Sequence, residues 1–196
     1  MKRLVVALIG ADGTGKTTLV DAFARTLDVK MERFYLGQKK FVLPLTGRWV
    51  ASQGRFRSEL FRWVLYPLDL RCRTLGMFIP KFGSRQMPVV LIDRLPMFPF
   101  EGRSWLLERI YRFALPRIDL LVLLTGDADL IYGRKAEGEK SELLRNMRKA
   151  ELAHAAVPAR RRLTLDVSRS VDQHVADIKE VLLDMNAEQH DRDASS

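Results

Sequence analysis

This 196-residue sequence has little cysteine and histidine: one cysteine, Cys72, and three scattered histidines, His154, His174 and His190. A single cysteine excludes an intramolecular disulfide and suits a reducing compartment. So few thiols and imidazoles cannot build a zinc-type cluster. We therefore expect a fold held by its apolar core, without a metal centre of cysteine or histidine.

The sequence also lacks a long hydrophobic run. The apolar residues 4–9 follow Met1-Lys2-Arg3 much as the apolar part of a secretory signal would, but the run is short and Asp12 and Lys16 soon follow it. Nothing approaches the roughly 20 apolar residues of a membrane-spanning helix. We expect a cytoplasmic chain with no membrane span.

Positively charged side chains outnumber negatively charged ones. Lys and Arg number 33 against 24 Asp and Glu, a net charge of +9. A basic balance favours anionic partners, which include nucleotides, phosphorylated small molecules, nucleic acid and acidic membrane surfaces. Because no basic and aromatic platform for single strands is evident, we expect a small phosphorylated partner rather than nucleic acid.

Apolar patterning predicts alternating strands and helices. Strands are expected at 4–9, 31–36, 88–93, 118–124 and 163–167, and helices at 16–27, 104–113, around 130–134, 141–155 and 171–185. Residues 47–77 predict two helices or one kinked at Pro67. The pattern indicates one domain over residues 1–186, an α/β/α sandwich around a parallel sheet of about five strands, with a polar tail at 187–196 that we expect to be disordered.

One stretch between the first strand and the first helix matches the phosphate-loop pattern G-x-x-x-x-G-K-[ST]. Glycines let successive N–H groups face inward, and the following helix adds its dipole. Lys16 can reach the β- and γ-phosphates of a nucleotide, and the Thr17 hydroxyl can face Mg²⁺. We predict binding of ATP and Mg²⁺ by this P-loop. The residues expected to bind the nucleotide are Gly10, Asp12, Gly13, Thr14, Gly15, Lys16, Thr17 and Thr18.

A second candidate group follows the apolar strand 88–93. Asp93 ends this strand, where a carboxylate can attend Mg²⁺, and Arg94 offers a guanidinium to phosphate oxygens. Arg134 precedes a charged segment broken by Gly138. We predict a mobile lid at about 134–142, with Arg134 stabilising charge on the transferring group.

The phosphate loop indicates a nucleoside triphosphate as the phosphoryl donor, but it does not indicate which reaction the protein catalyses. The N/T-K-x-D signature of a switch GTPase is missing. Two classes remain: a phosphotransferase, and an ATP-binding regulator with slow ATPase activity.

The chain resembles thymidylate kinases and related small-molecule kinases over nearly its whole length. The similarity lies in Gly10–Thr18 with Asp in its third position, in Asp93-Arg94 at the strand end, and in the segment from Pro116 to Arg134. Asp69 and Arg71 roughly match the family's Asp-Arg pair over the acceptor, with one residue between them.

The resemblance implies roles for these residues. Lys16, Arg94 and Arg134 would act on the transferring phosphoryl group, with Thr17 and Asp93 attending Mg²⁺. Asp93 would therefore be a catalytic residue, together with Lys16, Arg94 and Arg134. Asp12 would meet a sugar hydroxyl of the acceptor, and the resemblance places Asp69, Arg71 and Arg94 beside it.

The acceptor side departs from the family. The family's Arg-Glu-Pro-Gly-Gly motif is replaced by residues 35–39. Residues 95–99 replace the residues that help recognise thymine in the family. We therefore expect transfer of the ATP γ-phosphoryl group to a small molecule. Thymidylate is the default acceptor, and another nucleotide, a nucleoside or a phosphorylated metabolite is the alternative. The sequence leaves a homodimer open.

Overall fold

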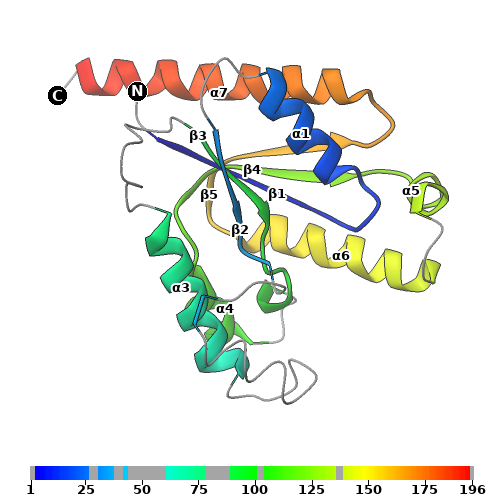
Figure 1. The fold of residues 1–196 in the computed structure, drawn as a ribbon, viewed down its shortest axis with the longest axis horizontal. Helices are drawn as coiled ribbons and strands as arrows, with labels where there is room; N and C mark the ends of the chain where they lie inside the picture. Colours follow the sequence, from blue (N-terminus) through cyan, green and yellow to red (C-terminus); the bar gives the residue numbers. More distant parts are fainter. Residues whose placement is uncertain are drawn as a thin grey trace.

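Five parallel strands form the sheet on which the chain is built (Figure 1). The computed structural model describes residues 3–26, 31–37, 42–43, 61–77, 89–100, 104–135 and 139–194. The strands are β1 (Leu4–Gly10), β2 (Met31–Tyr35), β3 (Val89–Arg94), β4 (Ile118–Thr125) and β5 (Ala159–Asp166). They lie in the order β2-β3-β1-β4-β5, each parallel to its neighbours. The predicted sheet of about five parallel strands is confirmed.

The three central strands are nearly continuous apolar runs because both faces of the sheet are covered. Side chains along a strand point alternately to opposite faces. Along β1, Val5 and Ile9 therefore join the core on one face, while Val6 and Leu8 join the core on the other.

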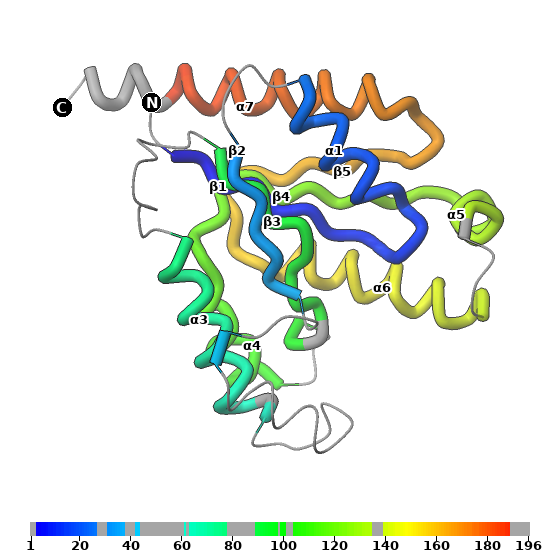
Figure 2. The backbone as a smooth tube through the Cα atoms, in the orientation of Figure 1, coloured from blue at the N-terminus to red at the C-terminus, as the bar shows by residue number. Residues whose placement is uncertain are grey.

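Six α-helices cover the two faces: α1 (Lys16–Thr26), α3 (Tyr66–Gly76), α4 (Trp105–Ala114), α5 (Ala128–Lys135), α6 (Lys140–Ala156) and α7 (Val171–Ala194), counted over the described residues. One core draws apolar residues from α1, α5 and α7, and the other draws them from α3, α4 and α6. Figures 1 and 2 show α1 beside α7 on one side of the sheet, with α3, α4 and α6 on the other. The predicted α/β/α sandwich is confirmed.

Side chains cap the first turns of α5 and α7. The Asp127 carboxylate accepts hydrogen bonds from the N–H groups of Asp129 and Leu130, at 2.8 and 2.9 Å, and so starts α5. At the start of α7, the Ser170 N–H donates to the Gln173 side chain, while the Gln173 N–H donates to the Ser170 hydroxyl. This reciprocal pair is a capping box.

Several boundaries differ from the sequence-based expectation. β5 begins at Ala159, four positions before the expected Leu163. Pro67 lies in the first turn of α3, directly after a π-helical turn, Phe61–Leu65, and residues 47–60 lie outside the described part. α7 continues to Ala194, past the expected start of the polar tail, and residues 136–138 of the predicted lid also lie outside the described ranges.

Because all strands are parallel, their C-terminal ends share one edge of the sheet, here called the carboxyl edge. Gly10, Arg94, Thr125 and Asp166 all end strands at this edge. Ligands of open α/β sheets bind outside that edge, so this is where we look for the site. In the described part of the chain, no helix combines the length and the apolar character needed to cross a membrane.

Candidate active site

The phosphate loop, residues 10–17, leaves β1 at the carboxyl edge and curls into α1. Gly10, Gly13 and Gly15 have φ angles of 153°, 91° and 84°, which residues with a Cβ rarely adopt. A Cβ on Gly10 would lie 2.7 Å from the main-chain oxygen of Leu124 on β4. The loop can therefore take this path only with glycine at position 10.

Side chains hold the loop in its curled form. The Thr14 hydroxyl donates to the Ala11 carbonyl at 2.9 Å. The Lys16 ammonium is almost fully buried and donates to the Gly10 carbonyl at 2.8 Å and to the Ala11 carbonyl. Thr17 is exposed on the first turn of α1. The loop thus presents a buried cation and a helix N-terminus in one place, the arrangement that binds phosphate.

Asp12 lies between two cations of the site. Its Oδ1 atom is 3.4 Å from the Arg94 guanidinium and 3.9 Å from Lys16 Nζ. Arg94 comes from the end of β3, so this contact joins the phosphate loop to the neighbouring strand. The structure therefore brings together three of the residues that the sequence predicted for the site.

Asp93 lies at the same strand end but is buried. Its Oδ2 atom accepts a 2.7 Å hydrogen bond from the Arg33 guanidinium. Its Oδ1 atom is also buried and has no hydrogen-bond partner among the described residues. A buried carboxylate oxygen without a donor is costly unless something else binds it.

This orphaned oxygen fits a Mg²⁺ site. Mg²⁺ prefers oxygen ligands, and it is commonly held by one or two protein groups together with phosphate and water oxygens. Thr17 and Asp93 would supply the protein oxygens. Phosphate oxygens of the nucleotide, together with water, would supply the other ligands.

Sequence reasoning missed Arg33, which contacts the predicted metal residue directly. Arg33 lies on β2, an edge strand, and its guanidinium also lies 3.4 Å from Asp21 on α1. The signal was weak, because a charged residue in an edge strand is usually only solvated. The parallel pairing of β2 with β3, known only from the structure, places Arg33 and Asp93 together.

Arg134 lies on α5, on the side of the site nearer to β5. Its guanidinium donates to the Val167 carbonyl at 3.1 Å, just after β5 ends. There the Ser168 N–H donates to the Asp166 carboxylate at 2.8 Å and lowers the pKa of that group. Arg134 is thus at the carboxyl edge, and its role on the transferring group stays a prediction.

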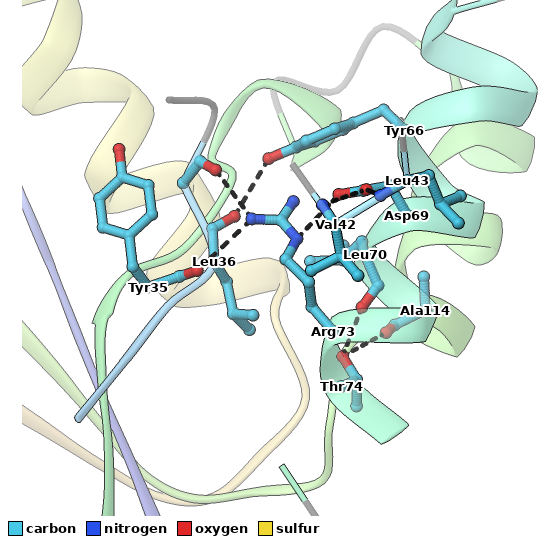
Figure 3. A network of polar contacts seen from close by, with 11 residues as sticks. Tyr35, Leu36, Val42, Leu43, Tyr66, Asp69, Leu70, Arg73, Thr74 and Ala114 are labelled. Atoms are coloured by element: carbon cyan, nitrogen blue, oxygen red, sulfur yellow. Dashed lines mark hydrogen bonds and ion pairs between the residues drawn. The ribbon is translucent and has the colours of Figure 1, made fainter. Parts of the chain in front are cut away.

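Asp69 lies inside the protein rather than in an open site (Figure 3). Its Oδ1 atom accepts from the N–H groups of Val42 and Leu43, at 2.9 and 2.8 Å, and its Oδ2 atom pairs with Arg73 Nε at 2.9 Å. This carboxylate ties the chain after β2 to α3, and it has no exposed surface to offer an acceptor.

Arg73, one turn after Asp69, extends this network. Its guanidinium donates to the Gly37 carbonyl at 3.0 Å and lies 5.6 Å from the centre of the Tyr66 ring. The Tyr66 hydroxyl donates to the Leu36 carbonyl at 3.1 Å, and burial raises the pKa of Tyr66 to about 12. The network therefore holds the main chain just beyond the end of β2.

The Arg71 side chain lies outside the Asp69–Arg73 network and packs against α4. Its guanidinium lies 4.9 Å from the centre of the Phe113 ring on α4. Both residues line an open cavity of about 550 Å³ with Ile118 and Ala159, the first residues of β4 and β5. That edge of the sheet is opposite the phosphate loop. Because the structure brings neither Asp69 nor Arg71 to the loop, we leave both out of the acceptor site proposed below.

The fold is similar to that of a thymidylate kinase of known structure. No protein-family model and no curated protein matches the sequence. A thymidylate kinase from Candida albicans matches in structure with a TM-score of 0.61 and 16% identity, over 94% of this chain and 93% of that one. A sugar kinase from Janibacter sp. HTCC2649 matches with a TM-score of 0.48 and 20% identity, over 94% of this chain and 95% of that one. A gluconokinase from Sinorhizobium meliloti 1021 matches with a TM-score of 0.49 and 17% identity, over 94% of this chain and 99% of that one. The predicted P-loop kinase-like fold is confirmed.

Proposed function

We propose that this protein is an ATP-dependent phosphotransferase that moves the γ-phosphoryl group of ATP to an oxygen of a small molecule. The observation that carries the proposal is the convergence of Lys16, Asp12 and Arg94 beside a buried Asp93 with an unpaired oxygen. A phosphate loop alone would suit any nucleotide-binding protein. A second cation and a buried carboxylate at the next strand are what phosphoryl transfer requires in addition.

Each residue has a distinct task in this proposal. Lys16 and the loop N–H groups bind the β- and γ-phosphates, and Arg94 faces the group that is transferred. Thr17 and Asp93 would hold Mg²⁺, which neutralises phosphate charge when bound. The bond from the γ-phosphorus to the β–γ bridging oxygen breaks with its electron pair left on ADP, and a bond from the γ-phosphorus to the acceptor oxygen forms. A phosphate acceptor carries no proton on that oxygen, whereas a hydroxyl acceptor releases its proton to solvent as ADP leaves.

Thymidylate is the acceptor that the sequence resemblance favours, and the fold shared with a thymidylate kinase is compatible with it. The absence of the family's acceptor motif after β2 argues for testing other acceptors as well. Asp12 is exposed beside Arg94, where it can accept a hydrogen bond from an acceptor hydroxyl. We therefore assign Asp12 to the acceptor side.

The test is the dependence of ATP turnover on the acceptor. We expect slow ATP hydrolysis by the protein with Mg²⁺ alone, and a large acceleration when the right nucleotide, nucleoside or sugar is added, because closure over the acceptor excludes water. Release of ADP across a panel of such compounds measures it. Asp12→Ala should remove most of the acceleration while ATP affinity, measured by calorimetry, changes little.

The opposite result would favour the second class of function. If no small molecule accelerated turnover but a macromolecular partner did, the protein would be an ATP-binding regulator. If ATP did not bind at all, the assignment of the phosphate loop would itself be wrong.

A further inference from the structure

Arg33, Asp93 and Asp21 form a small charged group next to the phosphate loop. Arg33 pairs with Leu91, a residue of the core on one face of the sheet, and its guanidinium reaches Asp93 two positions further along β3, where the pairing of β2 with β3 shifts register. α1 covers that face and contributes Asp21. The three side chains thus come from three different elements and meet beside the candidate metal site.

The guanidinium of Arg33 contacts two carboxylates with different atoms. One terminal nitrogen is 2.7 Å from Asp93 Oδ2, and the other is 3.4 Å from Asp21 Oδ1. The two acids differ in surroundings, because the Asp93 side chain is 10% exposed and that of Asp21 is 58% exposed. Arg33 therefore has one buried partner and one solvated partner within reach.

Asp21 lies one helical turn after Thr17 on α1, and residues four apart share a face of a helix. The solvated partner of Arg33 is thus next to the threonine that would attend Mg²⁺, while the buried partner is the carboxylate that would attend it. A guanidinium and a divalent cation near the same carboxylate repel each other and compete for its charge. Weakening either contact of Arg33 should therefore change how well the cation binds.

We propose that Arg33 is a positioning residue that sets the affinity of the nucleotide site for Mg²⁺, contacting Asp93 in competition with the cation and passing to Asp21 when the cation binds. This inference rests on the proposed function, since it assumes that a metal–nucleotide complex binds here. It assigns to β2 a part in metal binding that the phosphate-loop pattern does not contain.

The experiment is a Mg²⁺ titration of the whole protein at a fixed concentration of a non-hydrolysable ATP analogue, followed by the thermal unfolding midpoint and by calorimetry. In Arg33→Met we expect half-saturation at roughly three- to tenfold lower Mg²⁺, because a competing charge at a partly buried site is gone. Without Mg²⁺ the same variant should unfold at a lower temperature, since Asp93 has lost its partner. Arg33→Lys should restore part of the wild-type behaviour.

Asp21→Asn is the second variant, and its exposed position makes it safe for folding. It should raise the Mg²⁺ concentration at half-saturation, because Arg33 then stays with Asp93. If Asp21 acts through Arg33, Asp21→Asn has no such effect in the Arg33→Met background, which a double-mutant cycle measures. Arg112→Met is the matched control: it removes the same charge from a similarly exposed arginine on α4 that also pairs with a carboxylate, at the edge of the sheet opposite the phosphate loop, and should leave half-saturation unchanged.

An Arg33→Met titration that coincides with that of the wild type or of Arg112→Met would overturn the inference, as would an Asp21→Asn effect of equal size in both backgrounds. Either result leaves the proposed function intact if the analogue still binds with Mg²⁺. Failure of the wild-type protein to bind the analogue would contradict the proposed function and this inference together.

Discussion

Replacing Lys16 with alanine should lower the rate of phosphoryl transfer by about 10²–10³-fold, the usual cost of losing one preorganised charge in a site that excludes water. The Lys16 ammonium is buried in the phosphate loop, where the Gly10 and Ala11 carbonyls orient it. Phosphoryl transfer requires mostly positioning and charge stabilisation from the protein, so little else can replace this group.

The measurement is ADP release with saturating ATP, Mg²⁺ and the acceptor identified by the panel. Lys179→Ala is a suitable control, because Lys179 on α7 is a partly exposed lysine whose ammonium also donates to a main-chain carbonyl, that of Thr26. That variant should keep near-native turnover. Native turnover by Lys16→Ala would show that the chemistry does not take place at the phosphate loop.

The central part of the fold could be predicted from sequence because its signals are local. β1, β3 and β4 are short apolar runs that end in glycine, arginine and threonine at the carboxyl edge, and a buried parallel strand must look like this. The phosphate loop is likewise contained in one stretch, residues 10–17, so its geometry follows from its own glycines.

β5 shows why an edge strand is harder to predict. Its first half contains Arg160, Arg161 and Arg162, which read as a solvated segment in the sequence. In the structure Arg160 and Arg161 pair with Glu188 on α7, and Arg162 donates to carbonyls at the end of α6. Only the packing of two distant helices makes these charges compatible with a strand.

The residues of the candidate site likewise include some that the sequence predicts and some that it does not. Asp12, Lys16 and Arg94 could be predicted because a motif or a strand end places each of them. Arg33 could not, since its contact with Asp93 depends on the register between two strands about 60 residues apart. The sequence matches Asp69 only to the family's Asp-Arg pair, together with Arg71; its observed partner is Arg73, one helical turn further along α3.

The second large effect that we expect is on stability. Asp69→Ala should lower the free energy of unfolding by about 3–5 kcal/mol, because removing one partner of a buried ion pair leaves the other charge uncompensated. The Asp69 side chain has no exposed surface, and Arg73 is 6% exposed. The variant also leaves the N–H groups of Val42 and Leu43 without their acceptor. Urea unfolding followed by tryptophan fluorescence measures the change.

Glu108→Ala gives the matched control, since Glu108 pairs with Arg112 at the same four-residue spacing on α4 but at the surface. That variant should cost less than about 1 kcal/mol. Replacing the buried pair together, as Asp69→Leu with Arg73→Met, should recover the part of the loss that comes from the uncompensated arginine. The remaining loss then belongs to the two N–H groups after β2 and to the Gly37 carbonyl, which loses the hydrogen bond from Arg73. Equal costs for Asp69→Ala and Glu108→Ala would show that the buried network does not hold this part of the chain.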